Sequence, residues 1–280
     1  MTDSKVTDPA AVKNINNFTE FKEYISGGNI LEVINLDKYF SGLHAVNNVS
    51  FKVREHTIKA VIGPNGAGKT TLFNMIAGTF PPSGGKVKLF GEDIISLKPY
   101  QIAKKGLFRT FQNLKLNPSM SVLDNAMLGM HCAGSAGFIS AMLALPNSRR
   151  EEKYAKEKVL SILEWLGIAG LKDQDVGNLS FGKQRAVELA RIMAADPKVL
   201  LLDEPAAGLN MKETDELAEL IIKIREQGRT VLLVEHDMSL VMDISDEIVV
   251  LNFGRKIAEG TPAEIQRNED VIKIYLGGGD

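Results

Sequence analysis

The stretch from Gly63 to Thr71 combines glycines, a lysine and hydroxyl side chains at the spacing that a phosphate site requires. Gly63, Gly68, Lys69 and Thr70 fit the pattern G-x-x-x-x-G-K-[ST], between a short apolar run and a helical pattern. Glycines allow backbone N–H groups to curve around an anion, Lys69 adds a positive charge, and the Thr70 hydroxyl can ligate Mg²⁺. The alternative is an ordinary glycine-containing loop, which the strand–loop–helix context disfavours. We therefore predict that a nucleotide phosphate is bound by Gly63, Pro64, Asn65, Gly66, Ala67, Gly68, Lys69, Thr70 and Thr71.

Two adjacent carboxylates, Asp203 and Glu204, follow the aliphatic run that begins at Val199. Such a run is typical of a strand buried on both faces of a parallel sheet, and ligand-contacting groups gather at the carboxyl ends of these strands. Asp203 is expected to face a metal ion, and Glu204 to polarise a water molecule toward a γ-phosphate. Acidic residues at strand ends can also be plain surface groups. His236 ends the next aliphatic run and is either structural or part of the same site.

Other positions carry weaker signals. Gln112 ends a predicted strand and has either a role in the site or none. Ser180 is a good N-cap for an amphipathic helix, and together with Gly182 it forms a second helix N-terminus suited to an anion. The aromatic pair Tyr39-Phe40 either stacks on a nucleotide base or fills the core, and its spacing alone favours the core.

These side chains need a sheet whose strand ends meet at one edge. Aliphatic runs at 60–62, 199–202 and 230–234 predict buried strands of a mostly parallel core sheet. Alternating stretches at 45–53 and 86–90 predict a small antiparallel layer around the phosphate loop. The fold class is therefore α/β.

The remaining segments suggest the domain organisation. Residues 1–28 lack a firm pattern, end in two glycines, and are predicted to be an N-terminal extension or linker. Residues 29–280 suit one domain with a helical subdomain inserted at about 114–178. Within the insertion, helices are expected at 122–130 and 149–166, the first capped by the preceding serine.

Composition limits the classes of function. The 280 residues are 44% hydrophobic, and their net charge of −2 gives no global attraction for nucleic acid. One cysteine, Cys132, excludes an internal disulfide, and no Cys/His group has zinc spacing. No apolar run approaches the ~20 residues that span a bilayer, and the first thirty residues do not resemble a signal peptide. We expect a cytosolic chain that acts on a membrane only through other chains.

In this order, the motifs resemble those of the ATP-binding subunits of ABC transporters, from about residue 30 to the end. Residues 63–70 are similar to the family's Walker A motif, 109–112 to its Q-loop and 179–184 to its signature. Residues 199–204 are similar to its Walker B motif, and His236 to its switch histidine. The resemblance implies the P-loop NTPase fold, with ATP and Mg²⁺ as ligands. Phe40 falls where the family's base-stacking aromatic lies. This reverses the preference for the core, and Tyr39 becomes the second choice.

A closer resemblance is to the longer of the two ATPases in branched-chain amino-acid importers, the LivG type. It is carried by Arg-Thr-Phe-Gln at 109–112, the segments 204–210 and 235–238, and the tail 271–276. Importers of urea and short amides share much of this pattern, and the tail and signature are also similar in lipopolysaccharide-type export ATPases.

Two features depart from the wider family. Its usual signature is Leu-Ser-Gly-Gly-Gln, whereas here Phe181 replaces the first glycine and Lys183 the glutamine. Asn210 stands where most ABC proteins have an aspartate that crosses a dimer interface. Communication between two nucleotide sites is therefore expected to differ, while hydrolysis is expected to survive.

The resemblance implies a role for each motif residue. One chain supplies half of a site. Lys69 and Thr70 are implied to contact the phosphates and Mg²⁺, and Gln112 and Asp203 to lie near the metal. Glu204 is implied to be the general base, and His236 to contact the γ-phosphate. Ser180 and Gly182 are implied to complete the site of a second subunit. ATP would then close a dimer, and hydrolysis would open it.

The resemblance also implies partners. These are a second ABC ATPase, either a paralogue or a second copy, two integral membrane permease subunits, and indirectly a solute-binding protein. The expected location is the cytoplasmic face of the inner or plasma membrane, with no nucleic-acid partner. A GTPase is disfavoured because no Asn-Lys-x-Asp motif follows the phosphate loop. A soluble ABC ATPase outside transport remains an alternative, although such proteins usually carry two cassettes or long coiled-coil insertions.

Overall fold

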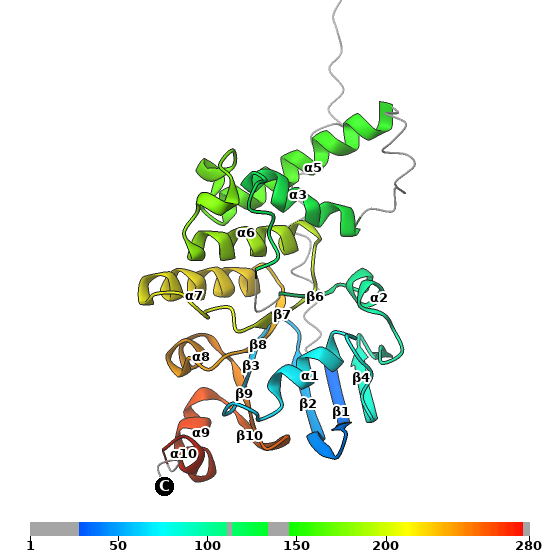
Figure 1. Cartoon of the computed structure of the whole chain (residues 1–280), viewed down its shortest axis with the longest axis vertical. Coiled ribbons are helices and arrows are strands. Elements are labelled where there is room, and N and C mark those ends of the chain that lie inside the picture. The colour runs from blue at the N-terminus through cyan, green and yellow to red at the C-terminus, as the bar shows by residue number, and fades with distance from the viewer. Residues whose placement is uncertain (1–27, 111–113, 134–145, 277–280) are drawn as a thin grey trace, which may run out of the picture.

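The computed structural model describes residues 28–110, 114–133 and 146–276 (Figure 1). The predicted linker therefore lies outside the described residues except for Gly28. No helix among the described residues has both the length and the apolar character to cross a membrane.

The described strands form two sheets. The larger sheet has the order β10-β9-β3-β8-β7-β6, in which all neighbours are parallel except the edge pair β10–β9. Its strands, in chain order, are β3 (Ile58–Ile62), β6 (Leu107–Arg109), β7 (Val199–Asp203), β8 (Thr230–Val234), β9 (Glu247–Asn252) and β10 (Arg255–Gly260). The smaller, antiparallel sheet has the order β2-β1-β4-β5, from β1 (Asn29–Phe40), β2 (Leu43–Arg54), β4 (Gly84–Leu89) and β5 (Glu92–Asp93). The predicted α/β class with a mostly parallel core sheet and an antiparallel layer is confirmed.

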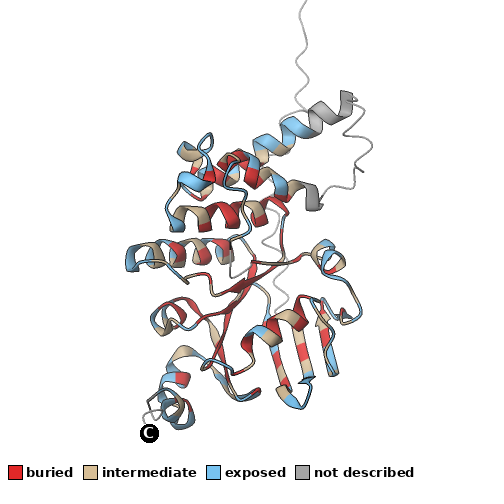
Figure 2. Cartoon of the chain, viewed as in Figure 1, coloured by how far each residue is buried: buried red, intermediate tan, exposed pale blue. Residues whose placement is uncertain are grey.

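Successive residues of the central strands face opposite sides of the sheet, and each side has its own core. On β7, Val199 and Leu201 pack with helix α1 (Lys69–Ile76) and the antiparallel sheet. Leu200 and Leu202 pack on the other side with α6 (Phe181–Ala194), α7 (Met211–Glu226) and α8 (Met238–Ile244). Figure 2 shows how completely the central strands are buried. Because both faces are covered, these strands are continuous aliphatic runs.

A separate helical cluster packs beyond the sheet. It contains α3 (Val122–Ala133), α5 (Pro146–Trp165) and one side of α6. The predicted insertion at 114–178 thus carries two of these helices, but their packing continues into α6, past residue 178. Residues 114–121 precede α3 and are not helical. As expected, the Ser121 hydroxyl caps α3 and accepts the N–H of Asp124 at 3.0 Å.

The two ends of the inserted segment are joined by a short backbone ladder. The N–H of Val122 donates to the carbonyl of Gln174 at 3.0 Å, and the N–H of Val176 donates to the carbonyl of Met120 at 3.1 Å. Ser121 and Asp175 form an antiparallel bridge between these bonds. We call this ladder the neck of the helical cluster.

Within the cluster, α3 and α6 approach closely at Gly129. A Cβ built on Gly129 would overlap the carbonyl oxygen of Arg191 and lie 3.1 Å from the Cβ of Ala194. The remaining helices are short: α2 (Pro99–Lys104), α9 (Pro262–Arg267) and α10 (Glu269–Leu276), with single 3₁₀ turns at Ala169–Leu171 and Val176–Asn178.

Candidate functional site

The phosphate loop joins β3 to α1 and is tightly enclosed by neighbouring backbone. Gly63 and Gly68 have positive φ values of 153° and 99°, and a Cβ on either would overlap a backbone carbonyl oxygen, of Leu251 and Ala45 respectively. Only glycine fits both conditions. The other predicted loop residues lie between these two glycines or at the start of α1. The strand–loop–helix context predicted for the phosphate motif is therefore confirmed.

Lys69 is buried in this loop. Its Nζ donates to the carbonyl oxygens of Gly63 at 2.7 Å and Pro64 at 3.0 Å. Burial lowers the pKa of Lys69, and the nearby charges of Glu204 and Asp203 oppose that shift. One cation and two adjacent carboxylates, from two distant segments of the sequence, are thus within electrostatic reach of one another.

The two carboxylates stand at the carboxyl end of β7. The Glu204 N–H donates to the carbonyl of Val234 at 2.9 Å, which anchors it beside β8. Its φ of 47° lies in the left-handed region, which a glutamate seldom adopts and which is enriched at functional sites. The backbone therefore turns sharply at the predicted catalytic carboxylate.

Arg109 is a site neighbour to which the sequence analysis gave no role. Its guanidinium donates to Oδ2 of Asp203 at 2.6 Å and to Oδ1 of Asn74, on α1, at 2.6 Å. Both charged side chains of the ion pair are largely buried, with 11% of Arg109 and 5% of Asp203 exposed. Arg109 thereby joins β6, the helix of the phosphate loop and the predicted metal-side carboxylate. A charged residue within the strand predicted to end at Gln112 was the one available signal.

His236 follows β8, as predicted, and lies next to a buried carboxylate. The Glu235 side chain is fully buried and accepts the N–H groups of Ala206 at 2.7 Å and His236 at 3.0 Å. Burial raises the pKa of Glu235, while these backbone hydrogen bonds oppose the shift. The His236 imidazole is 62% exposed, with Nδ1 at 3.8 Å from Oε2 of Glu235. Glu235 thus fixes the backbone from which the imidazole projects.

Ser180 caps α6, as expected, and its hydroxyl accepts the N–H of Lys183 at 3.4 Å. Ser180 and Gly182 lie at the start of α6, which packs on the opposite face of the sheet from α1, the helix that follows the phosphate loop.

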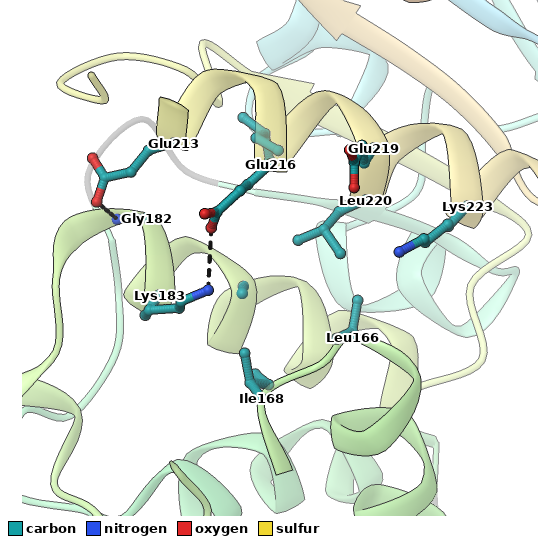
Figure 3. Close-up of a pocket in the computed structure, with 11 residues that line it drawn as sticks. Leu166, Ile168, Gly182, Lys183, Glu213, Glu216, Glu219, Leu220 and Lys223 are labelled. Carbon is teal, nitrogen blue, oxygen red and sulfur yellow. Dashed lines mark hydrogen bonds and ion pairs between the residues drawn. The ribbon is translucent and has the colours of Figure 1, made fainter. Parts of the chain in front are cut away.

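Two of the residues that depart from the family pattern, Lys183 and Asn210, make contacts with α7, and Figure 3 shows the contact of Lys183. The Lys183 amine pairs with Oε2 of Glu216 at 3.1 Å. Asn210 is the N-cap of α7 and forms a reciprocal capping box with Glu213. Both residues therefore have contacts within their own chain.

The aromatic candidates lie at the end of β1 and make separate contacts. Phe40 is 42% exposed and meets Phe80 edge-on, with ring centroids 5.6 Å apart. Tyr39 is 54% exposed and stacks on His44 at 4.0 Å. Neither fills the core, so both are accessible to a base. Gln112 lies outside the described residues.

The C-terminal helix also reaches the phosphate loop. A hydrogen bond with the backbone of Gly63 holds Tyr275, and partial burial, which outweighs this bond, raises the pKa of Tyr275 to about 12. The sequence analysis treated this tail only as part of a resemblance, because nothing local in it signals a contact with a loop far away in the sequence.

Mg²⁺ needs few protein ligands when it is bound with a nucleotide, because phosphate oxygens and water supply most of its coordination. No group of three or more His, Cys, Asp or Glu side chains suited to a metal occurs in the described part of the chain. A single carboxylate at a strand end beside the phosphate loop fits such shared coordination. Asp203, with the Thr70 hydroxyl, therefore suits Mg²⁺ bound together with phosphates.

Comparisons with known proteins agree with the motifs. A family model described as "ABC transporter" matches residues 46–207, and one described as "Branched-chain amino acid ATP-binding cassette transporter" matches residues 255–280. The branched-chain amino acid transport ATP-binding protein BraF of Pseudomonas aeruginosa is 48% identical over 249 residues, which cover 89% of this chain and 98% of BraF. LivG of Escherichia coli is 45% identical with the same coverage.

A solved structure is similar throughout. The ADP conformation of an ATP-binding cassette of an ABC transporter has a TM-score of 0.79 and 31% identity, covering 89% of this chain and 99% of that one. The resemblance inferred from the motifs is thereby confirmed, as is the P-loop NTPase fold.

Proposed function

Because this chain belongs to the ABC transporter family of ATP-binding proteins, we propose that it hydrolyses ATP to drive a membrane importer of branched-chain amino acids. The ATPase activity follows from the family. The solute rests on similarity to BraF and LivG and on the match at residues 255–280. The carrying observation is the convergence of Lys69, Asp203 and Glu204 at one end of the parallel sheet.

In the proposed reaction each residue has one task. The loop N–H groups and Lys69 bind the phosphates, and Thr70 and Asp203 are the residues that would hold Mg²⁺. When bound, the ion would supply positive charge to offset the charge that builds on the phosphoryl group. Glu204 accepts a proton from the attacking water, and His236 contacts the γ-phosphate. Gln112 is proposed to act near the metal, and Phe40 to stack on the base.

The second half of the site is proposed to come from another ATPase subunit. Ser180 and Gly182 begin α6, on the opposite face of the sheet from the helix of the phosphate loop, which supports a role toward a neighbour's nucleotide. This arrangement makes ATP the contact between two subunits. The proposed dimer, of two copies or of this chain with a paralogue, is proposed to bind two permease subunits at the cytoplasmic face of the membrane. A solute-binding protein would act on the opposite side.

Site chemistry is tested with purified chain. Glu204→Gln keeps the shape of the side chain but removes the base, and general-base catalysis contributes roughly 10²–10⁴-fold, so hydrolysis is expected to fall by that factor while ATP binding persists. Lys69→Ala is expected to abolish ATP binding measured by fluorescence. Glu219→Gln, the same change on the surface of α7, is the matched control. A normal turnover rate in Glu204→Gln would remove Glu204 from the base role.

Transport is tested separately. The chain is purified in mild detergent from its native membranes, and the proteins that accompany it are identified. Recovery of a second ATPase and two integral membrane subunits is expected, and uptake of labelled leucine into vesicles containing the complex should require ATP. Recovery of the chain alone, or with ribosomes or DNA, would leave the ATPase intact and refute the transport role.

A further inference from the structure

The carboxylate of Glu213, in the first turn of α7, lies against the first turn of α6 (Figure 3). Its Oε1 accepts the N–H of Gly182 at 3.2 Å, while Oε2 accepts the Asn210 side-chain amide at 2.9 Å. The pKa of Glu213 is lowered, first by the Asn210 backbone and then by hydrogen bonds from the Ser180 hydroxyl and the Gly182 N–H. A charged carboxylate therefore occupies the two donors of the signature segment.

The contact between Glu213 and Gly182 is close. A Cβ on Gly182 would lie 2.9 Å from Cγ of Glu213 and 3.0 Å from its Cδ, so a larger residue at this position would require the Glu213 side chain to shift. Glu213 is also held from the other side, because its own N–H donates to Oδ1 of Asn210 at 3.1 Å. The carboxylate is thus positioned by its own helix and aimed at a neighbouring one.

These donors have a second use, which rests on the proposed function. In the proposed dimer, the Ser180 hydroxyl and the Gly182 N–H donate to a phosphate of the nucleotide on the partner subunit. One N–H makes one short hydrogen bond, and a phosphate brought to it would also meet the negative charge of Glu213. The phosphate and the carboxylate therefore compete for the same atoms.

We propose that Glu213 is an internal anion that occupies the phosphate-binding donors of the signature segment until the partner's ATP displaces it. Displacement makes ATP-driven closure of the dimer harder, and so sets the ATP concentration at which the dimer forms. It also releases the side-chain amide of Asn210, so the loop before α7 and the signature segment change together.

Lys183 supports the exchange. Its amine is held by Glu216 at 3.1 Å, one turn along α7 from Glu213. The positive charge lies one residue from Gly182 and favours whichever anion is bound there. A lysine in place of the family's usual glutamine thus suits a signature segment that always holds a negative charge.

The test measures dimer formation by analytical ultracentrifugation across an ATP titration. All variants carry Glu204→Gln, so that hydrolysis does not reopen the dimer. Glu213→Gln retains a side chain that can complete the α7 cap, and Glu213→Ala removes the carboxylate entirely. Glu219→Gln removes the same charge from the same helix, away from Gly182, and is the matched control.

Both Glu213 variants are expected to dimerise at an ATP concentration several-fold lower than the parent, and Glu219→Gln at the parent concentration. Dimerisation of the Glu213 variants under conditions in which the parent does not dimerise would also support the proposal. An unchanged or higher concentration, with a parent that dimerises, would overturn the role of Glu213 and leave the proposed function intact. Failure of every variant to dimerise would overturn both the ATP-closed dimer of this chain and the competition that depends on it.

Hydrogen exchange supplies a measurement on the single subunit. Loss of the carboxylate is expected to speed exchange of the Gly182 amide in Glu213→Ala but not in Glu219→Gln, with the rest of α6 unchanged. Equal exchange in the two variants would show that Glu213 does not occupy this donor in solution.

Discussion

Replacing Gly129 with alanine sets helix propensity against packing. Alanine is better than glycine inside a helix by about 1 kcal/mol, so propensity alone predicts a more stable protein. At this position, however, the new Cβ overlaps the Arg191 carbonyl oxygen and lies 2.9 Å from its carbon. Relief requires α3 and α6 to separate by roughly 1 Å, which forfeits up to about half of the dispersion energy of contacts across the gap.

The packing cost decides the sign. Overfilling a packed core costs about 1–3 kcal/mol, and the contact here is with backbone, which cannot rotate away, so we take the upper end. After subtracting the gain in propensity, Gly129→Ala should lower the free energy of unfolding by about 2 kcal/mol. Such a loss is a sizeable part of the ~5–15 kcal/mol that stabilises a typical domain.

Urea unfolding followed by circular dichroism measures this change. Gly170→Ala is the control, because a Cβ on Gly170 has no neighbour within 4 Å. The control is expected to stay within about 0.5 kcal/mol of the parent. A Gly129→Ala protein that is as stable as the parent, or more so, would show that α3 and α6 are not in close contact.

Three further changes have signs that follow from the structure. Arg109→Met leaves the largely buried Asp203 without its ion-pair partner and should cost about 3 kcal/mol in urea unfolding, most of which the added Asp203→Asn should restore. Burial raises the pKa of Glu235 above 4.5, so protonation of Glu235 favours the folded state. The wild-type protein should therefore lose stability relative to Glu235→Gln as the pH rises above 4.5. A constant difference in melting temperature between the two proteins from pH 4 to pH 7 would contradict this. Thr261 is the N-cap of α9, and its hydroxyl donates to Oε2 of Glu264 at 2.9 Å. Thr261→Ala should therefore lower the free energy of unfolding by about 1 kcal/mol in the same urea assay.

The sequence predicted those parts of the site whose geometry is local. The phosphate loop could be placed because glycine spacing and a strand–helix junction lie within one short stretch. Asp203, Glu204 and His236 could be placed because the ends of buried parallel strands share one edge. These arguments need no knowledge of which distant segments touch.

The missed residues act across elements. Arg109, on β6, contacts Asp203 on β7 and Asn74 on α1. Glu213, on α7, contacts Gly182 on α6. Neither pairing has a spacing rule, because each depends on how whole helices and strands pack. Asn210 and Lys183 were recognised as unusual from the sequence, but their partners on α7 became evident only in the fold.

The neck of the helical cluster has a consequence for the order of folding. β6 pairs with β7 although about ninety residues separate them, and closing a flexible loop of that length is costly in chain entropy. The bonds between residues 118–123 and 172–177 fasten the insertion at its base, leaving an effective loop of roughly thirty residues. Closing the neck first lowers the entropic barrier to adding β6 by about 1 kcal/mol. We therefore expect the helical cluster to form before the sheet edge that carries Arg109. Variants that weaken the neck should refold more slowly than their loss of stability alone would predict.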